Sequence, residues 1–112
     1  MARFERWDVV AVPFPYVERP VRQRRPAVIV AVITEAPHDL LWVLMITAAA
    51  NPPWPDDVPV NPASGTGLPI ASVVRTAKIA TIAAADARRI GRLPAAVLSA
   101  VAAVLGRRLT KD

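Results

Sequence analysis

Residues 22–33 read RQRRPAVIVAVI, so three arginines and a proline lead directly into an uninterrupted apolar run. The run is rich in β-branched side chains and contains no glycine, which is typical of a buried strand, although periodicity alone leaves a helix open. Pro26 lacks an N–H and biases the residue before it toward extended geometry, so we expect Arg25 to lie at the mouth of the strand. A guanidinium held there suits phosphate recognition, while the alternative is a solvated charge run.

Length and charge predict one basic domain over residues 1–112. The 14 Lys and Arg residues outnumber 9 Asp and Glu, which gives a formal net charge of +5. This balance favours an anionic partner, such as nucleic acid, an acidic protein segment or a membrane surface. Cysteine is absent, which excludes disulfides and thiolate sites. The charged N-terminal residues lack a signal-peptide core, and no apolar run reaches the roughly 20 residues that span a bilayer, so we expect a cytoplasmic protein.

Further strands are predicted on both sides of the apolar run. Residues 7–14 form the first strand, and residues 25–34 and 40–47 form a hairpin around a turn at residues 35–39. Residues 58–60 can form only a short edge strand, which is followed by a loop.

Residues 68–82 return to a β-rich composition with imperfect alternation. Arg75 and Lys78 would fall on opposite faces of an unbroken strand. We therefore expect a bulge in this segment, or two short strands with a bend between them.

From Pro94 the apolar residues change to a helical period. Val97, Val101, Val104 and Leu105 share one stripe, and Pro94 suits a first helical turn. The chain therefore has strands first and one helix last, without βαβ alternation. This order predicts a mainly-β fold, an antiparallel sheet or small barrel closed by a C-terminal helix.

Few residues carry obvious catalytic chemistry. The sole histidine, His38, lies in a predicted turn and cannot form a multi-histidine metal site, and Asp56 and Asp57 are interpreted as solvated loop residues. Arginine and a threonine at a strand end remain. If the second and third strands pair as a hairpin, Arg25 and Thr47 lie at the same end of it. From the residues alone, an ordinary strand terminator is the favoured interpretation of Thr47.

Six short pieces, spread in order over nearly the whole chain, match one known pattern. They are DVVAVPFP at 8–15, RRPAVIV at 24–30, IT at 46–47, GLP at 67–69, SVVR at 72–75 and DARRIGRL at 86–93. Together they resemble the PemK/MazF family of type II toxin–antitoxin ribonucleases. The chain departs from the family pattern at Trp7, where members usually carry glycine, and at Ala48, where many carry serine.

The resemblance implies an SH3-like antiparallel β-barrel, usually a homodimer, that cleaves single-stranded RNA without a metal or other cofactor. In such cleavage the ribose 2′-OH attacks the adjacent phosphate and leaves a cyclic phosphate and a free 5′-OH. Arg25, before the proline of the Arg-Pro motif, and Thr47, in the Ile-Thr step, match the family's catalytic positions. The resemblance also implies a cognate antitoxin whose acidic disordered tail folds on binding.

For RNA binding we add Phe14, Arg22, Arg24 and Arg75, because charge and aromatic stacking hold single strands. A core position is an equally good interpretation of Phe14. A guanidinium is a poor general base at neutral pH, so Arg25 is best interpreted as an electrostatic clamp, with acid and base roles left open.

Two other functions stay open. A catalytically silent, toxin-like module could bind a protein such as DNA gyrase, but the retained Arg25 and Thr47 favour the ribonuclease. A non-cleaving nucleic-acid binder would need only the positive charge, and its affinity should fall steeply with salt.

Overall fold

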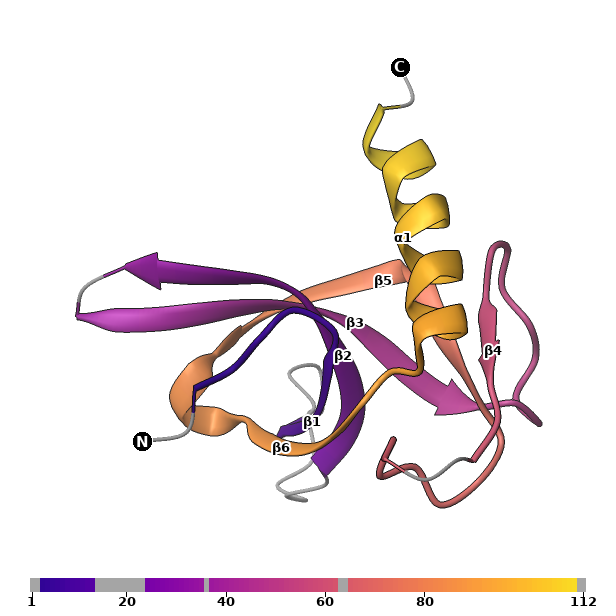
Figure 1. Ribbon diagram of the computed structural model, residues 1–112, viewed down its shortest axis with the longest axis horizontal. Coiled ribbons are helices and arrows are strands. Elements are labelled where there is room, and N and C mark those ends of the chain that lie inside the picture. Colours follow the sequence, from indigo (N-terminus) through magenta and orange to yellow (C-terminus); the bar gives the residue numbers. More distant parts are fainter. Residues whose placement is uncertain (1–2, 14–23, 36, 63–64, 111–112) are drawn as a thin grey trace.

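One antiparallel sheet and one long terminal helix make up most of the fold (Figure 1). The structure, a computed structural model, describes residues 3–13, 24–35, 37–62 and 65–110. Its elements are β1 (Asp8–Pro13), β2 (Arg24–Glu35), β3 (His38–Ala48), β4 (Val58–Val60), β5 (Ser72–Ala83), the short 3-10 helix η1 (Ala84–Asp86), β6 (Arg88–Arg92) and α1 (Ala95–Thr110).

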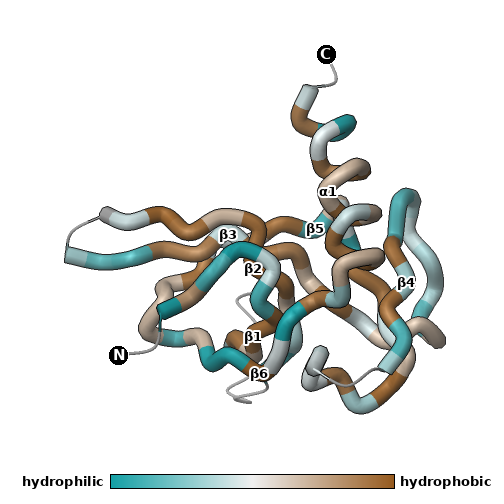
Figure 2. Tube along the Cα trace, viewed as in Figure 1, coloured by the Kyte–Doolittle hydropathy of each residue, from teal (hydrophilic) through white to brown (hydrophobic). Residues whose placement is uncertain are grey.

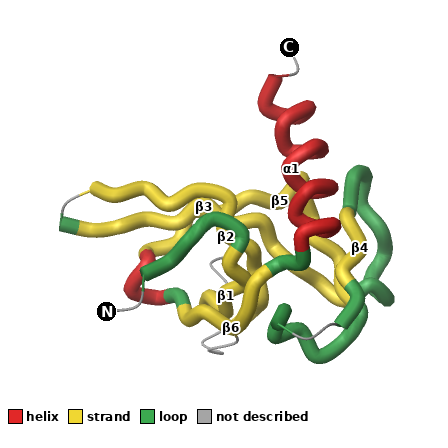
Figure 3. The backbone as a smooth tube through the Cα atoms, in the orientation of Figure 1, coloured by secondary structure: helices red, strands yellow, loops and turns green. Residues whose placement is uncertain are grey.

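The strand order is β4-β5-β3-β2-β1-β6, and all neighbouring strands are antiparallel. The sheet curls, so that β1 and the edge strand β6 wrap beneath the β2–β3 hairpin (Figure 3). Strand β4 forms the opposite edge, beside α1. This curled half-barrel confirms the predicted mainly-β, SH3-like antiparallel fold with a C-terminal helix.

The predicted hairpin is present and longer than expected. Its pairs run from Ala27 opposite Met45 to Glu35 opposite His38. The turn is therefore shorter than residues 35–39, because both strands continue toward the hairpin tip. One extra residue in the middle of β2 shifts the register, and such a bulge bends and twists a strand.

The first half of the β2 apolar run, residues 27–30, is buried because hydrophobic side chains pack on both faces of the sheet, whereas Val32 is exposed. Figure 2 shows the hydrophobic residues along the central strands. One cluster lies between the sheet and α1, and the other lines the opposite face. The first includes Val9, Val28, Leu44, Ile46, Val74, Val101 and Leu105, and the second includes Val10, Val12, Ile29, Leu41, Val43 and Met45. Burial on both faces explains why β1 and residues 27–30 of β2 are continuously apolar rather than alternating.

Helix α1 buries the predicted stripe against the sheet. Val101 and Leu105 are buried, Val97 and Val104 are partly buried, and the Pro94 carbonyl accepts the first helical hydrogen bond. In the described ranges, no helix has the length and apolar character needed to cross a membrane.

Strand β6 has no counterpart among the predicted strands. It pairs with β1, and the fully buried Asp8 carboxylate stabilises this pairing. That carboxylate accepts from the Glu5 backbone N–H at 2.9 Å and lies 3.3 Å from both Arg89 and Arg92. Most β6 side chains are exposed, so the strand lacks an alternating apolar pattern and depends on these long-range contacts.

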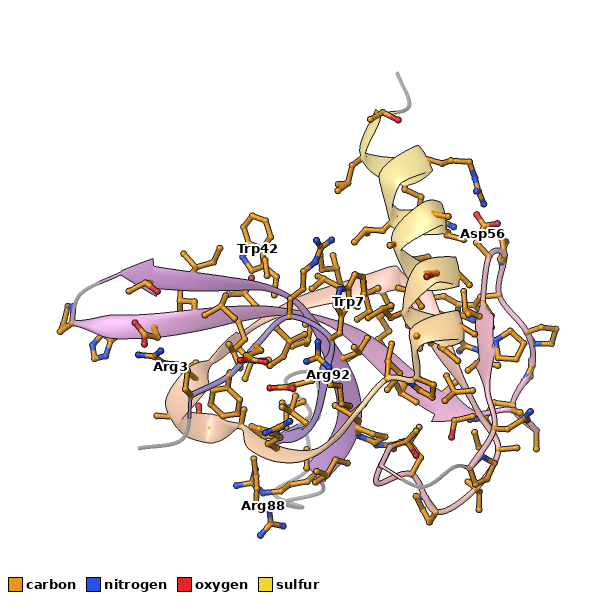
Figure 4. The ribbon with its side chains drawn as sticks, in the orientation of Figure 1. Arg3, Trp7, Trp42, Asp56, Arg88 and Arg92 are labelled. Atoms are coloured by element: carbon orange, nitrogen blue, oxygen red, sulfur yellow. The ribbon has the colours of Figure 1, made fainter. Side chains whose placement is uncertain are left out.

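The first strand begins at Asp8 rather than at Trp7, and Phe14 lies outside the described residues. Trp7 has φ 77, a left-handed conformation that interrupts strand geometry and that glycine adopts most easily. Its indole is buried in the cluster beneath α1, with the Arg6 guanidinium 4.6 Å from the ring centroid (Figure 4). The conformation explains why glycine suits this position in the family pattern.

Candidate active site

A small cavity lies at the open end of the β2–β3 hairpin, where β5 joins β3. Its volume is about 100 Å³. The described residues that line it are Arg25, Met45, Ile46, Thr47, Arg75 and Lys78.

The hairpin register brings Arg25 and Thr47 together. Ala27 pairs with Met45, so two steps further along each strand place Arg25 level with Thr47. Arg25 is exposed and Thr47 is partly buried, and both line the cavity. The shared strand end that the sequence predicted is therefore present, while a catalytic role for the pair stays a prediction.

An irregularity in β5 lets two of its cationic side chains line the same cavity. Leu44 pairs with Ile79, but Ile46 pairs with Val74, so β5 carries extra residues at this point. The expected bulge is confirmed, and it allows both Arg75 and Lys78 to line the cavity rather than opposite faces of the sheet. The sequence did not predict Lys78 as a site residue, because its direction depends on where the bulge falls.

Arg75 is held by several partners at once. Its guanidinium lies 3.3 Å and 3.1 Å from the two carboxylate oxygens of Asp57 and donates to the Pro52 carbonyl at 2.9 Å. It also stacks on the Trp54 ring, 4.5 Å from the centroid. Arg75 thus fixes the loop that links β3 and β4, and its predicted role in RNA binding remains open.

The expectation that Asp57 is a solvated loop residue is wrong. Its side chain is only 8% exposed and forms a two-pronged ion pair with Arg75. It also accepts from the Trp54 backbone N–H at 2.9 Å. Asp56, labelled in Figure 4, is more exposed and pairs with Arg108 of α1 at 3.0 Å. The two ion pairs join residues 18 and 52 positions apart in the chain, which composition cannot reveal.

Thr47 has a partner that sequence reasoning missed. The Asn51 side-chain amide donates to the Thr47 hydroxyl oxygen at 2.6 Å. Asn51 follows a tight turn, in which its backbone N–H donates to the Ala48 carbonyl at 3.0 Å. The signal in the sequence was an asparagine four residues after the threonine, just before two prolines.

Of the other predicted RNA-binding residues, the structure describes Arg24, which is not among the described residues that line the cavity. The Arg24 guanidinium donates to the Asp86 carbonyl at 2.9 Å and to the Ala11 carbonyl at 3.3 Å, which ties β2 to its neighbours. Adjacent strand residues point to opposite faces, so Arg24 and Arg25 diverge. Phe14 and Arg22 lie outside the described residues.

The cavity chemistry fits an oxygen-rich anion. Among the described lining residues, Arg25, Arg75 and Lys78 carry only hydrogen-bond donors, and Thr47 carries a hydroxyl. None of these lining residues is a carboxylate or a histidine. Across the described ranges, no three His, Asp or Glu side chains gather into a potential metal site.

The family model for the PemK-like, MazF-like toxin of type II toxin–antitoxin systems matches residues 5–109. The chain belongs to this family. The resemblance drawn from six short pieces is therefore confirmed, and the cavity residues can be considered as those of a PemK/MazF-like toxin. No curated protein sequence matched the chain.

Solved structures of similar fold are also PemK/MazF-like. The Mycobacterium tuberculosis toxin MazF-mt6 is 27% identical, with a TM-score of 0.65, over 94% of this chain and 98% of that one. A MazE–MazF crystal structure from Deinococcus radiodurans (Form-II) is 21% identical, with a TM-score of 0.67, over 96% of both chains. At that identity the Deinococcus likeness supports the fold alone.

Proposed function

We propose that the protein is a metal-independent, sequence-selective endoribonuclease toxin that cleaves single-stranded RNA, including mRNA, in the cytoplasm. Toxins of the PemK/MazF family are generally endoribonucleases, which supports this choice among the functions left open by the sequence. The observation that carries the proposal is the cavity in which Arg25, Lys78 and Thr47 offer donors to one phosphate-sized anion.

The proposed reaction is a transesterification within the RNA, in which the phosphoryl group passes from the 5′-oxygen to the 2′-oxygen. The ribose 2′-oxygen attacks the adjacent phosphorus, the bond to the 5′-oxygen breaks, and a 2′,3′-cyclic phosphate and a 5′-OH result. The 2′-OH loses its proton to water and the leaving oxygen gains one, so no cofactor enters the balance. Arg25 stabilises the negative charge that builds on the phosphate oxygens, and Thr47 adds one hydroxyl hydrogen bond.

A protein antitoxin is the proposed cellular partner. The similar Deinococcus structure is a MazE–MazF complex, so that relative was solved with a partner of this kind. Here the net charge of +5 suits an acidic, disordered antitoxin tail that folds on binding.

We also propose that the toxin acts as a homodimer. Trp42 and Ile79 are 45% and 50% exposed, and they lie on the same face of neighbouring strands beside a groove of about 390 Å³. Figure 4 shows Trp42 standing on the side of the sheet that carries α1. Exposed aromatic and aliphatic groups gathered in this way favour contact with a second copy.

The first test is cleavage of a long single-stranded RNA in EDTA, with the cut ends mapped. We expect discrete cuts with 5′-OH ends from the wild-type protein and no detectable cleavage by Arg25→Ala, which should stay folded because Arg25 is exposed. Arg88→Ala is the matched control, since it removes another exposed arginine outside the described cavity lining.

A folded Arg25→Ala protein with full activity would contradict the assigned catalytic role. If the wild-type protein binds RNA without cutting it, the silent toxin-like module becomes the better function, and the search moves to a protein target. Binding that collapses with salt would instead support the general nucleic-acid binder.

A further inference from the structure

The hydroxyl group of Thr47 has a single proton, and the structure limits where that proton can point. The Asn51 Nδ2 group donates to the Thr47 Oγ1 atom at 2.6 Å. A hydroxyl provides one donor and two acceptor sites, and here an amide N–H occupies one acceptor site. The Thr47 proton is therefore turned away from Asn51.

The lining of the cavity offers that proton little to bind. The other polar side chains among the described lining residues belong to Arg25, Arg75 and Lys78, and these side chains have no acceptor atoms. A bound anion with several oxygens supplies an acceptor that these side chains lack. The Thr47 hydroxyl is thus set up as a donor to the ligand rather than to the protein.

The loop that carries Asn51 is fixed before any ligand arrives. The Asn51 backbone N–H donates to the Ala48 carbonyl and closes a turn. The carbonyl of the next residue, Pro52, accepts a hydrogen bond from Arg75 at 2.9 Å. Arg75 is fixed in turn by its ion pair with Asp57. A donor that is already oriented adds transition-state stabilisation without reorganising during the reaction.

We propose that Asn51 is a positioning residue that keeps the Thr47 hydroxyl oriented as a hydrogen-bond donor to a non-bridging phosphate oxygen. Asn51 acts through Thr47 and does not itself touch the reacting atoms. The proposal rests on the proposed ribonuclease function. It identifies the residue that orients Thr47, one of the two proposed catalytic side chains.

The decisive comparison is between three exposed-loop variants. Asn51→Ala removes the donor and lets the hydroxyl rotate, so we expect a loss of about 10-fold in the single-turnover cleavage rate. Asn51→Asp places a carboxylate that accepts the Thr47 proton, so its rate should fall by about 10²–10³-fold, as for loss of the donor itself. Ala50→Asp adds the same charge at the neighbouring exposed residue and should keep most of the activity.

Two controls separate orientation from general damage. In a Thr47→Val background, Asn51→Ala should have no further effect on rate, because the group that it positions is gone. The melting temperatures of the Asn51 variants should match the wild type, since Asn51 is exposed.

A second readout does not need cleavage. Inorganic phosphate is titrated into each isotopically labelled protein, and binding is followed by NMR at the Thr47 and Lys78 amides. We expect binding to Asn51→Asp to be weaker than binding to Ala50→Asp by about 10-fold or more.

The outcomes distinguish failure of the positioning role of Asn51 from failure of the ribonuclease function. If Asn51→Asp and Ala50→Asp behave alike in rate and in phosphate binding, the role of Asn51 is overturned while the ribonuclease function stands. If phosphate binding follows the expected order but the wild-type protein never cuts RNA, the positioning of Thr47 is supported and the ribonuclease function fails.

Discussion

Trp7 combines a backbone cost and a packing gain in one residue. Its φ of 77 is unfavourable for any side chain with a Cβ, by roughly 1–2 kcal/mol. Its indole is buried beneath α1. Its backbone N–H donates to the Ile29 carbonyl at 2.7 Å, and its carbonyl accepts from the Leu93 N–H at 3.1 Å. The buried ring outweighs the strain, which is how a tryptophan is accommodated where the family usually has glycine.

This balance predicts an unusual order of stability at position 7. Trp7→Ala loses the buried ring and keeps the strained backbone, so we expect a loss of about 3–5 kcal/mol. Trp7→Gly loses the same ring but relieves the strain, so it should be more stable than Trp7→Ala by about 1–2 kcal/mol. Urea unfolding measures both values, and a glycine variant less stable than the alanine variant would contradict the argument.

At the scale of elements, the loop between β3 and β4 contacts two of the residues that line the cavity, Thr47 and Arg75. It is attached to β5 through Arg75 and Asp57 and to α1 through Asp56 and Arg108. The first attachment is largely shielded from water, with side chains 11% and 8% exposed, whereas the second is at the surface. Exposed ion pairs contribute little, so the attachment to β5 holds the loop.

Replacing the guanidinium group of Arg75 should therefore loosen this loop. Arg75→Lys keeps the charge but loses the two-pronged contact with Asp57 and the stacking on Trp54, so local opening should become easier by about 1–2 kcal/mol. Hydrogen exchange at the Asp57 amide, which donates to the Trp54 carbonyl, reports this opening.

The matched control for that experiment is Arg108→Lys. Its pair with Asp56 is exposed, so exchange at the Asp57 amide and RNA cleavage should both stay close to wild type. Equal exchange rates in the two variants would show that the β5 attachment does not hold the loop.

At the scale of the whole molecule, the curled sheet leaves one apolar area beyond the reach of α1. The helix covers the end of the sheet near β4, while Trp42 and Ile79 lie on the uncovered part of the face it packs on. A charge in this area should weaken the proposed dimer, because it would be buried without a partner.

We expect Trp42→Lys to shift the protein toward monomer in sedimentation measurements, with the fold retained. Ile70→Lys is the control, because Ile70 is another exposed apolar residue and is not among the described residues that line the Trp42 groove. If both variants and the wild type show the same association constant, the Trp42 surface is not the dimer contact.

The sequence by itself determined the features that depend on neighbouring residues. Apolar runs and turn residues predicted β1 to β5 and the hairpin, and the helical period predicted α1. The shared position of Arg25 and Thr47 followed from counting along a hairpin. The family pattern added the fold and the function class, because its short pieces keep their order along the chain.

Only the tertiary structure decided the features that depend on distant residues. Strand β6, with its exposed side chains, is held by the buried Asp8, and the bulge in β5 brings Lys78 into the cavity. The two-pronged contact from Arg75 to Asp57 and the Asn51 contact to Thr47 depend on how the loop folds back. These contacts depend on strand register and loop path, which the packing of the whole chain sets and local periodicity does not record.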